Sequence, residues 1–228
     1  MMLILFYNIC KYYMLPHIQT APNPRILLVS GIHGDECEVI DFVKEAVQHY
    51  SVELQPLLYI PELSPSAVRQ KTRLNSEGKD MNRCFFSDTD VFEVLEAQKV
   101  LLPHHFQLAV SFHEDPSQDQ FYLYDTGVSH EIPSVQHFLN YLCEIGVSLW
   151  SGIDDDNDPF LGYEVVNGRA SVPPGRLSRE RNKGIFEIWL INTLIAEHVL
   201  TLEIPGKAPL KIKRAIVDAF FRLVISNA

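Results

Sequence analysis

Apolar residues along the chain follow two different spacings, and the two alternate. Continuous apolar runs at residues 25–29, 57–60, 108–112 and 198–203 have the length of buried strands. Apolar positions three or four residues apart mark the stretches 36–50, 91–102, 134–145, 187–196 and 210–225, which predicts helices there. Pro103 ends the second helix, and Pro205 with Gly206 ends the last strand.

This alternation predicts the fold class. Helices between consecutive buried strands are the usual crossovers of a parallel sheet. We therefore expect an α/β fold with a mixed, mostly parallel twisted sheet flanked by helices. Residues 151–184 are rich in Gly, Pro, Asp and Asn, which predicts a long loop. With 228 residues, the chain has the size of one ordinary domain, and we expect a single domain over residues 1–228.

Charge and composition argue against several kinds of partner. The formal net charge is −10 and no stripe of Lys and Arg interleaved with aromatic residues stands out, so nucleic acid is not an expected partner. Residues 1–9 are apolar, but Asn8 and Lys11 interrupt a run far shorter than the ~20 residues of a membrane-spanning helix. The segment also lacks the charge order and cleavage site of a signal peptide. We expect a cytoplasmic protein that has no membrane partner.

The first candidate for chemistry follows the first strand directly. His33 and Glu36 lie three residues apart in a turn that two glycines loosen, and a pair with this spacing can reach one metal ion from one side. Open α/β sheets place their sites at the carboxyl ends of strands. The pair also fits a surface turn in which Asp35 caps the helix that follows.

A second candidate segment spans residues 73–85. Asn75 and Gly78 suit the first and fourth positions of a turn, which brings Arg73 toward Asn82 and Arg83. Two guanidinium groups and an amide suit an anionic substrate, because guanidinium binds carboxylate in a bidentate fork. A solvated basic loop is the alternative interpretation.

Two more polar side chains stand at the ends of apolar strands. His113 follows the run 108–112, and Glu203 closes the run 198–203. Burial at such a position raises the pKa of a carboxyl group toward the range that is useful to a general base. The alternatives are a packed histidine and a glutamate exposed at the sheet edge.

Taken together and in this order, the four segments resemble the zinc carboxypeptidase family. That family includes pancreatic carboxypeptidases, murein peptide amidases, and the succinylglutamate desuccinylase and aspartoacylase branch. Its pattern is HxxE, then RxNxxGxDxNRxF, then a histidine at a strand end, then a glutamate near the C-terminus. The resemblance covers about residues 25–205. It implies a zinc carboxypeptidase-like fold and one Zn²⁺ per chain, held by His33, Glu36 and His113 with an open position for water.

The resemblance also implies roles for the other residues. Asp80 would accept a hydrogen bond from the first ligand histidine. Arg73 would stabilise the oxyanion and Glu203 would act as general base. Asn82 and Arg83 would bind the carboxylate of the substrate. 

The tyrosine and the specificity residue of the family carry over less directly. Tyr163 is the candidate for the family's tyrosine, with Tyr122 and Tyr124 as alternatives. Glu187 lies in the segment aligned with the specificity pocket, which favours a leaving residue that bears an amine.

These features predict a metallocarboxypeptidase or peptide amidase that cleaves an amide bond next to a free carboxylate in a small peptide or peptide-like substrate. One alternative is an N-acyl amino acid deacylase, although such relatives carry a β-rich domain after the catalytic glutamate, where this sequence has a single predicted helix. Another is an inactive zinc-binding interaction protein, against which the presence of Arg73 and Glu203 argues.

Overall fold

A mixed sheet runs through the computed structural model, which describes residues 15–50, 54–127, 132–154, 162–172 and 183–228. In the described residues its strand order is β1-β3-β2-β4-β9-β5-β8-β7-β6. The bounds are β1 (Ile18–Gln19), β2 (Ile26–Ser30), β3 (Leu57–Ile60), β4 (Phe106–Asp115), β5 (Tyr122–Gly127), β6 (Gly152–Ile153), β7 (Glu164–Val166), β8 (Arg169–Val172) and β9 (Ala196–Pro205). The central strands β3, β2, β4 and β9 are parallel to one another, whereas β5 runs antiparallel to β9.

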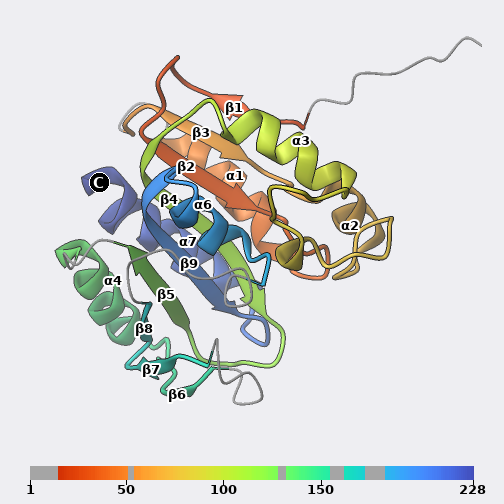
Figure 1. Ribbon diagram of the computed structural model, residues 1–228. Coiled ribbons are helices and arrows are strands. Elements are labelled where there is room, and N and C mark those ends of the chain that lie inside the picture. Colours follow the sequence, from red (N-terminus) through yellow and green to blue (C-terminus); the bar gives the residue numbers. More distant parts are fainter. Residues whose placement is uncertain (1–14, 51–53, 128–131, 155–161, 173–182) are drawn as a thin grey trace, which may run out of the picture.

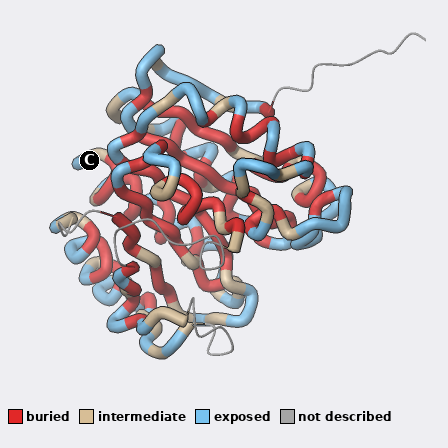
Figure 2. The backbone as a smooth tube through the Cα atoms, viewed as in Figure 1, coloured by how far each residue is buried: buried red, intermediate tan, exposed pale blue. Residues whose placement is uncertain are grey.

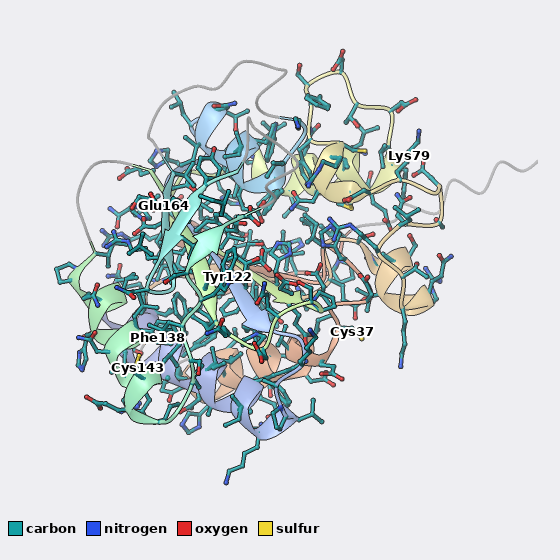
Figure 3. All side chains as sticks on the ribbon, turned by 90° about the horizontal axis from the view of Figure 1, so that it is seen from below. Cys37, Lys79, Tyr122, Phe138, Cys143 and Glu164 are labelled. Carbon is teal, nitrogen blue, oxygen red and sulfur yellow. The ribbon has the colours of Figure 1, made fainter. Side chains whose placement is uncertain are left out.

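Helices cover both faces of the sheet (Figure 1). Their bounds are α1 (Glu38–Tyr50), α2 (Pro65–Gln70), α3 (Phe92–Leu101), α4 (Pro133–Glu144), α6 (Phe186–Asn192) and α7 (Leu210–Leu223), with single 3-10 turns η1 (Met81–Arg83) and η2 (Ile225–Asn227). One core packs α1, α4 and α7 against the sheet, and a second core packs α3 and α6 against the other face. Phe138 of α4 and Tyr122 of β5 lie on opposite sides of the sheet (Figure 3). Within the described residues, no helix is long and apolar enough to cross a bilayer.

The expected α/β fold is confirmed, and burial explains why its strands were visible in the sequence. Every residue of β2 and β3 is buried, because helices cover both faces of these strands. The central strands therefore form a continuous buried band (Figure 2). Such strands are nearly uniformly apolar rather than alternating.

Two expectations about the second half of the chain were wrong. The helix expected at 187–196 ends at Asn192, because Leu194 adopts a left-handed backbone (φ 61°) and Ala196 already pairs with Phe106 in the sheet. The expected loop 151–184 contains the strands β6, β7 and β8. Asn167 and Gly168, both at positive φ, form the tight turn that joins β7 to β8. The parts of that loop at 155–161 and 173–182 lie outside the described residues.

A buried lysine links α7 to the first residue of α1 and to the end of β4. The side chain of Lys213 is 1% exposed, and its Nζ lies 2.5 Å from Glu38 Oε2 and 2.5 Å from Glu114 Oε2. The other oxygen of Glu114 accepts hydrogen bonds from the backbone N–H groups of Glu38 and Val39, at 2.8 and 3.2 Å. The Glu114 carboxylate thus caps α1 from the neighbouring strand, and Lys213 balances its charge.

We expect Lys213→Met to lower the free energy of unfolding by ~3–5 kcal/mol, because it leaves the Glu114 carboxylate buried without its cation. Urea denaturation of the variant and the wild type measures this change. Arg214→Met is the matched control one residue along α7, where the ion pair with Glu45 is exposed on both sides and its loss should change stability little. Equal losses in the two variants would show that the buried lysine has no special role.

Candidate active site

Three neighbouring strands place polar side chains side by side on one face of the sheet. His113 of β4 pairs in register with Glu203 of β9, and Glu203 pairs in register with Tyr122 of β5. Residues directly opposite each other on paired strands point to the same face. The end of β4 and β9 thus carries an imidazole, a carboxyl group and a phenol in one row.

The turn after β2 brings His33 and Glu36 to the same place. Gly34 makes this path possible: a Cβ at that position would lie 1.9 Å from the carbonyl oxygen of Ala67. The Gly34 N–H donates to the Thr72 carbonyl at 2.9 Å, which fixes the turn against the segment after α2. The glycine is therefore required by close backbone approach, and α1 begins only at Glu38.

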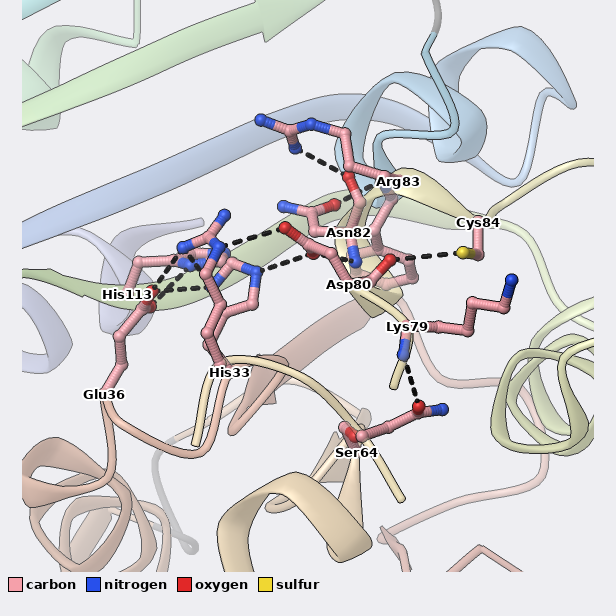
Figure 4. Close-up of polar contacts among 12 residues, drawn as sticks. His33, Glu36, Ser64, Lys79, Asp80, Asn82, Arg83, Cys84 and His113 are labelled. Carbon is pink, nitrogen blue, oxygen red and sulfur yellow. Dashed lines mark hydrogen bonds and ion pairs between the residues drawn. The ribbon is translucent and has the colours of Figure 1, made fainter. Parts of the chain in front are cut away.

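The two histidines converge on the carboxylate of Glu36 (Figure 4). His33 Nδ1 lies 2.6 Å from Glu36 Oε1, and His113 Nδ1 lies 2.8 Å from Glu36 Oε2. All three residues are buried, and their potential ligand atoms lie within 4.8 Å of one another. Two imidazoles and one carboxylate are a common donor set for a catalytic divalent metal that keeps an open position. The donor set therefore fits a metal, and the three residues predicted as ligands are brought together.

The titration of Glu36 reflects this crowding. Burial alone would raise the pKa of its carboxyl group, but the adjacent imidazoles of His113 and His33 hold that pKa far below its ordinary value. An ionised carboxylate between two imidazoles is the form that a metal requires.

A turn in the segment 73–85 brings Arg73 beside Asp80. Asn75 organises this turn: its carbonyl accepts from the Gly78 N–H at 2.9 Å, and its side-chain oxygen accepts from the N–H groups of Glu77 and Lys79. Arg73 Nε then donates to Asp80 Oδ2 at 3.0 Å.

Asp80 also contacts the first ligand histidine, as the family resemblance implied. Its Oδ1 lies 3.1 Å from His33 Nε2, on the side of the ring that faces away from Glu36. Burial would raise the pKa of Asp80, but His33 and Arg73 lower it to about 2. Asp80 is therefore ionised and able to fix the orientation of the His33 ring.

Asn82, Arg83 and Glu187 meet on the far side of His113. Asn82 Oδ1 accepts from the Phe186 N–H at 2.7 Å, and Asn82 Nδ2 donates to Glu187 Oε2 at 3.3 Å. Glu187 Oε1 lies 3.1 Å from His113 Nε2. Arg83 Nη1 donates to the carbonyl of Asn82 at 2.7 Å. Glu187 thus has protein partners on both oxygens, a feature that its place in the sequence did not predict.

A cavity of about 280 Å³ opens onto these groups. All the residues predicted for the site line this cavity except Asp80. They are His33, Glu36, Arg73, Asn82, Arg83, His113, Tyr163, Glu187 and Glu203. Tyr122 and Tyr124 line it as well, so the position of the tyrosines does not choose among the three. Thr126, Thr201 and Asp115 also line the cavity but were not predicted, although they lie on the same face of β5, β9 and β4 as predicted residues. Alternation along those strands was the available signal.

Glu203, Tyr122 and Tyr124 have pKa values outside their ordinary ranges. Burial raises the pKa of the Glu203 carboxyl well above its usual value, and the charge of Glu36 raises it further, which together outweigh the lowering effect of His113. Burial likewise raises the pKa of Tyr122 and of Tyr124, with added repulsion from neighbouring acids. The Tyr122 hydroxyl donates to Asp115 Oδ2 at 2.9 Å. A carboxyl group with a raised pKa beside a candidate metal centre is typical of a residue that exchanges protons.

The sequence matches one family model over more than half of its length. The model of the succinylglutamate desuccinylase/aspartoacylase catalytic domain covers residues 22–151. The chain belongs to this family. The part of the chain that matches the desuccinylase/aspartoacylase model contains His33, Glu36, the segment 73–85 and His113. It ends before Tyr163, Glu187 and Glu203. No curated protein matches the chain in sequence.

Solved structures share the fold at low sequence identity. A candidate metallopeptidase from Shewanella baltica OS155 superimposes with a TM-score of 0.73 at 16% identity, covering 93% of this chain and 81% of that one. A metallo-carboxypeptidase from Burkholderia cenocepacia gives 0.58 at 15% identity over 90% and 57% of the two chains. A succinylglutamate desuccinylase/aspartoacylase from Rhodobacter sphaeroides gives 0.51 at 18% identity over 88% and 56%. This likeness is one of fold, and the three proteins are hydrolases by name.

If His33, Glu36 and His113 bind a metal, protein purified without chelator should contain one divalent ion per chain. His33→Ala should lose most of it, because the variant removes one of three ligands. Elemental analysis measures the metal content. His137→Ala changes an exposed histidine on α4 and should retain the ion. Full metal content in His33→Ala would contradict the ligand assignment.

Proposed function

We propose that the protein is a zinc-dependent hydrolase that cleaves an amide bond next to a free carboxylate, as a metallocarboxypeptidase or peptide amidase does. The observation that carries this proposal is the meeting of three groups in one cavity: the His33, Glu36 and His113 cluster, the carboxyl group of Glu203, and two arginines. Membership in a family of hydrolases supports it. Zinc is the proposed metal because its catalytic sites use this donor set.

Bound zinc supplies a Lewis acid and lowers the pKa of water toward ~7. The residues of the chain supply the rest of the proposed chemistry. Glu203 takes a proton from the attacking water and later delivers it to the leaving nitrogen, which suits a carboxyl group whose pKa is raised. Arg73, held by Asp80, places its guanidinium at the edge of the cluster, where it stabilises the oxyanion that develops.

The substrate carboxylate is assigned to Arg83 and Asn82. Arg83 lines the cavity and is oriented by its hydrogen bond to the carbonyl of Asn82. The side-chain oxygen of Asn82 accepts from the Phe186 N–H, and one hydrogen of its amide group is donated to Glu187. The second amide hydrogen is the one assigned to the substrate. Tyr163, half-buried on the cavity wall, is the proposed hydroxyl that contacts the group being cleaved.

A second candidate function is deacylation of an N-acyl amino acid. The match to the succinylglutamate desuccinylase/aspartoacylase catalytic domain favours it. Such substrates also present an amide next to a free carboxylate, so the same residues would serve. The two candidates differ in what occupies the acyl side of the bond, and substrate comparison separates them.

Glu203→Gln should retain the metal and lose ~10²–10⁴-fold in turnover, because a general base typically contributes that much and glutamine cannot accept the proton. Steady-state kinetics with zinc-loaded protein and metal analysis of the same sample give the two readouts. Glu197→Gln is a matched control: it makes the same change at an exposed glutamate on the same strand, β9, and should leave turnover near the wild-type value. Near-normal turnover of Glu203→Gln would remove the proposed base.

A short peptide with a free C-terminal carboxylate should be cleaved with a higher kcat/KM than either the same peptide as its C-terminal amide or N-acetylaspartate. The carboxylate should contribute ~10–100-fold, since a hydrogen bond to a charged group is worth about 1.5–3 kcal/mol. Arg83→Ala should remove this difference between acid and amide. A preference for N-acetylaspartate would overturn the peptidase reading in favour of the deacylase, and zinc binding without turnover of any of the three would point to an inactive zinc protein.

A further inference from the structure

Glu187 is a buried acid inside an apolar helix. It lies on α6 between Phe186 and Ile188, and its side chain is 5% exposed. An ionised carboxylate in such a place needs partners for both oxygens. It has them: Oε1 lies 3.1 Å from His113 Nε2, and Oε2 accepts from Asn82 Nδ2 at 3.3 Å.

This contact repeats the arrangement around the other histidine. His33 and His113 each turn Nδ1 toward Glu36 and Nε2 toward a second carboxylate, Asp80 in one case and Glu187 in the other. The two outer distances are both 3.1 Å. A carboxylate on the outer nitrogen places the proton there, leaves Nδ1 as the free electron pair, and raises the basicity of the ring.

The same contacts argue against a role for Glu187 in reading the substrate. An amine on the substrate would have to compete with the His113 ring and the Asn82 amide for a carboxylate that is almost fully buried. Displacement of His113 would also release a proposed metal ligand. The acid that the sequence aligns with a specificity pocket is therefore better placed to act on the histidine than on the substrate.

We propose that Glu187 is the positioning residue of His113, fixing its tautomer and ring orientation for metal binding, and that it does not select the side chain of the substrate. Asn82 braces Glu187 through its amide, and the Phe186 N–H braces Asn82 in turn. The N-terminal turn of α6 thereby supports the metal centre. This inference rests on the metal site of the proposed function.

Glu187→Gln should weaken zinc binding by ~10–100-fold, the usual effect of removing an outer carboxylate from a ligand histidine. Competition with a chromophoric chelator measures the zinc affinity of each protein. Asp80→Asn should show a loss of similar size through His33. Asp115→Asn is the matched control, because it removes a charge from the same cavity but Asp115 bonds Tyr122 rather than an imidazole, and its zinc affinity should stay within a few-fold of wild type.

Glu187→Asp separates position from charge. It keeps the charge but withdraws the oxygens from His113, so its zinc affinity should also fall. Urea denaturation of the metal-free proteins should show that Glu187→Gln and Glu187→Asp are folded. If one of them does not fold, the zinc affinity of the other tests the inference.

Three results would overturn the inference. Wild-type zinc affinity in folded Glu187→Gln would remove the positioning role while the metal site stands. A changed kcat/KM ratio between peptides ending in lysine and in phenylalanine, at unchanged zinc affinity, would restore the specificity role. Failure of the wild-type protein to bind zinc would end the proposed function and this inference together.

Discussion

The contact of the Glu36 carboxylate with His33 and His113 is the interaction on which the rest of the site depends. Each oxygen of this carboxylate faces the Nδ1 atom of one histidine, and the two rings come from segments 80 residues apart in the sequence. This arrangement needs α1, β2 and β4 to meet at fixed positions. The parallel pairing of β2 with β4 sets the two strands, and the Glu114 carboxylate joins the end of β4 to the first turn of α1. Lys213 balances the charge of that buried carboxylate, so the helix α7 helps to hold the His33, Glu36 and His113 cluster in place.

The change of strand direction at β9 creates the cavity. The parallel strands β2, β4 and β9 bring their carboxyl ends to one edge, which is where open α/β sheets form sites. β5 then runs back antiparallel to β9, so Tyr122, Tyr124 and Thr126 extend the face that carries Glu203 and Thr201. The antiparallel neighbour therefore adds a wall of the cavity beside the His33, Glu36 and His113 cluster.

The sequence predicted the parts of this structure that local chemistry determines. The central strands are buried on both faces, so their apolar runs were easy to detect, and His33, Glu36, His113 and Glu203 lie at or shortly after the ends of such runs. The turn at Asn75 and Gly78 was predicted for the same reason, since both residues act within five positions of each other. The strand β5 was missed because its polar residues face the cavity, and β7 with β8 was missed although Asn167 and Gly168 form a recognisable hairpin turn.

Contacts between distant segments could not be predicted in this way. Whether Glu187 faces the substrate or a histidine depends on how α6 packs against the sheet, and nothing near Glu187 in the sequence determines that packing. The position of Tyr163 depends in the same way on the pairing of β6 with β7.

The acids of the cavity differ in function because their partners differ. Glu36 and Glu187 accept from imidazoles, Glu114 is paired with Lys213, and Asp115 accepts from Tyr122. Each of these carboxylates has a hydrogen bond or an ion pair with a neighbouring side chain that holds its position. Burial raises the pKa of Glu203, and the charges of Glu36 and Asp115 add to this effect against the opposing attraction of His113, whereas the two imidazoles lower the pKa of Glu36. Two similar glutamates on one cavity wall thus divide into one that remains ionised between the histidines and one that can carry a proton, and the division follows from their surroundings alone.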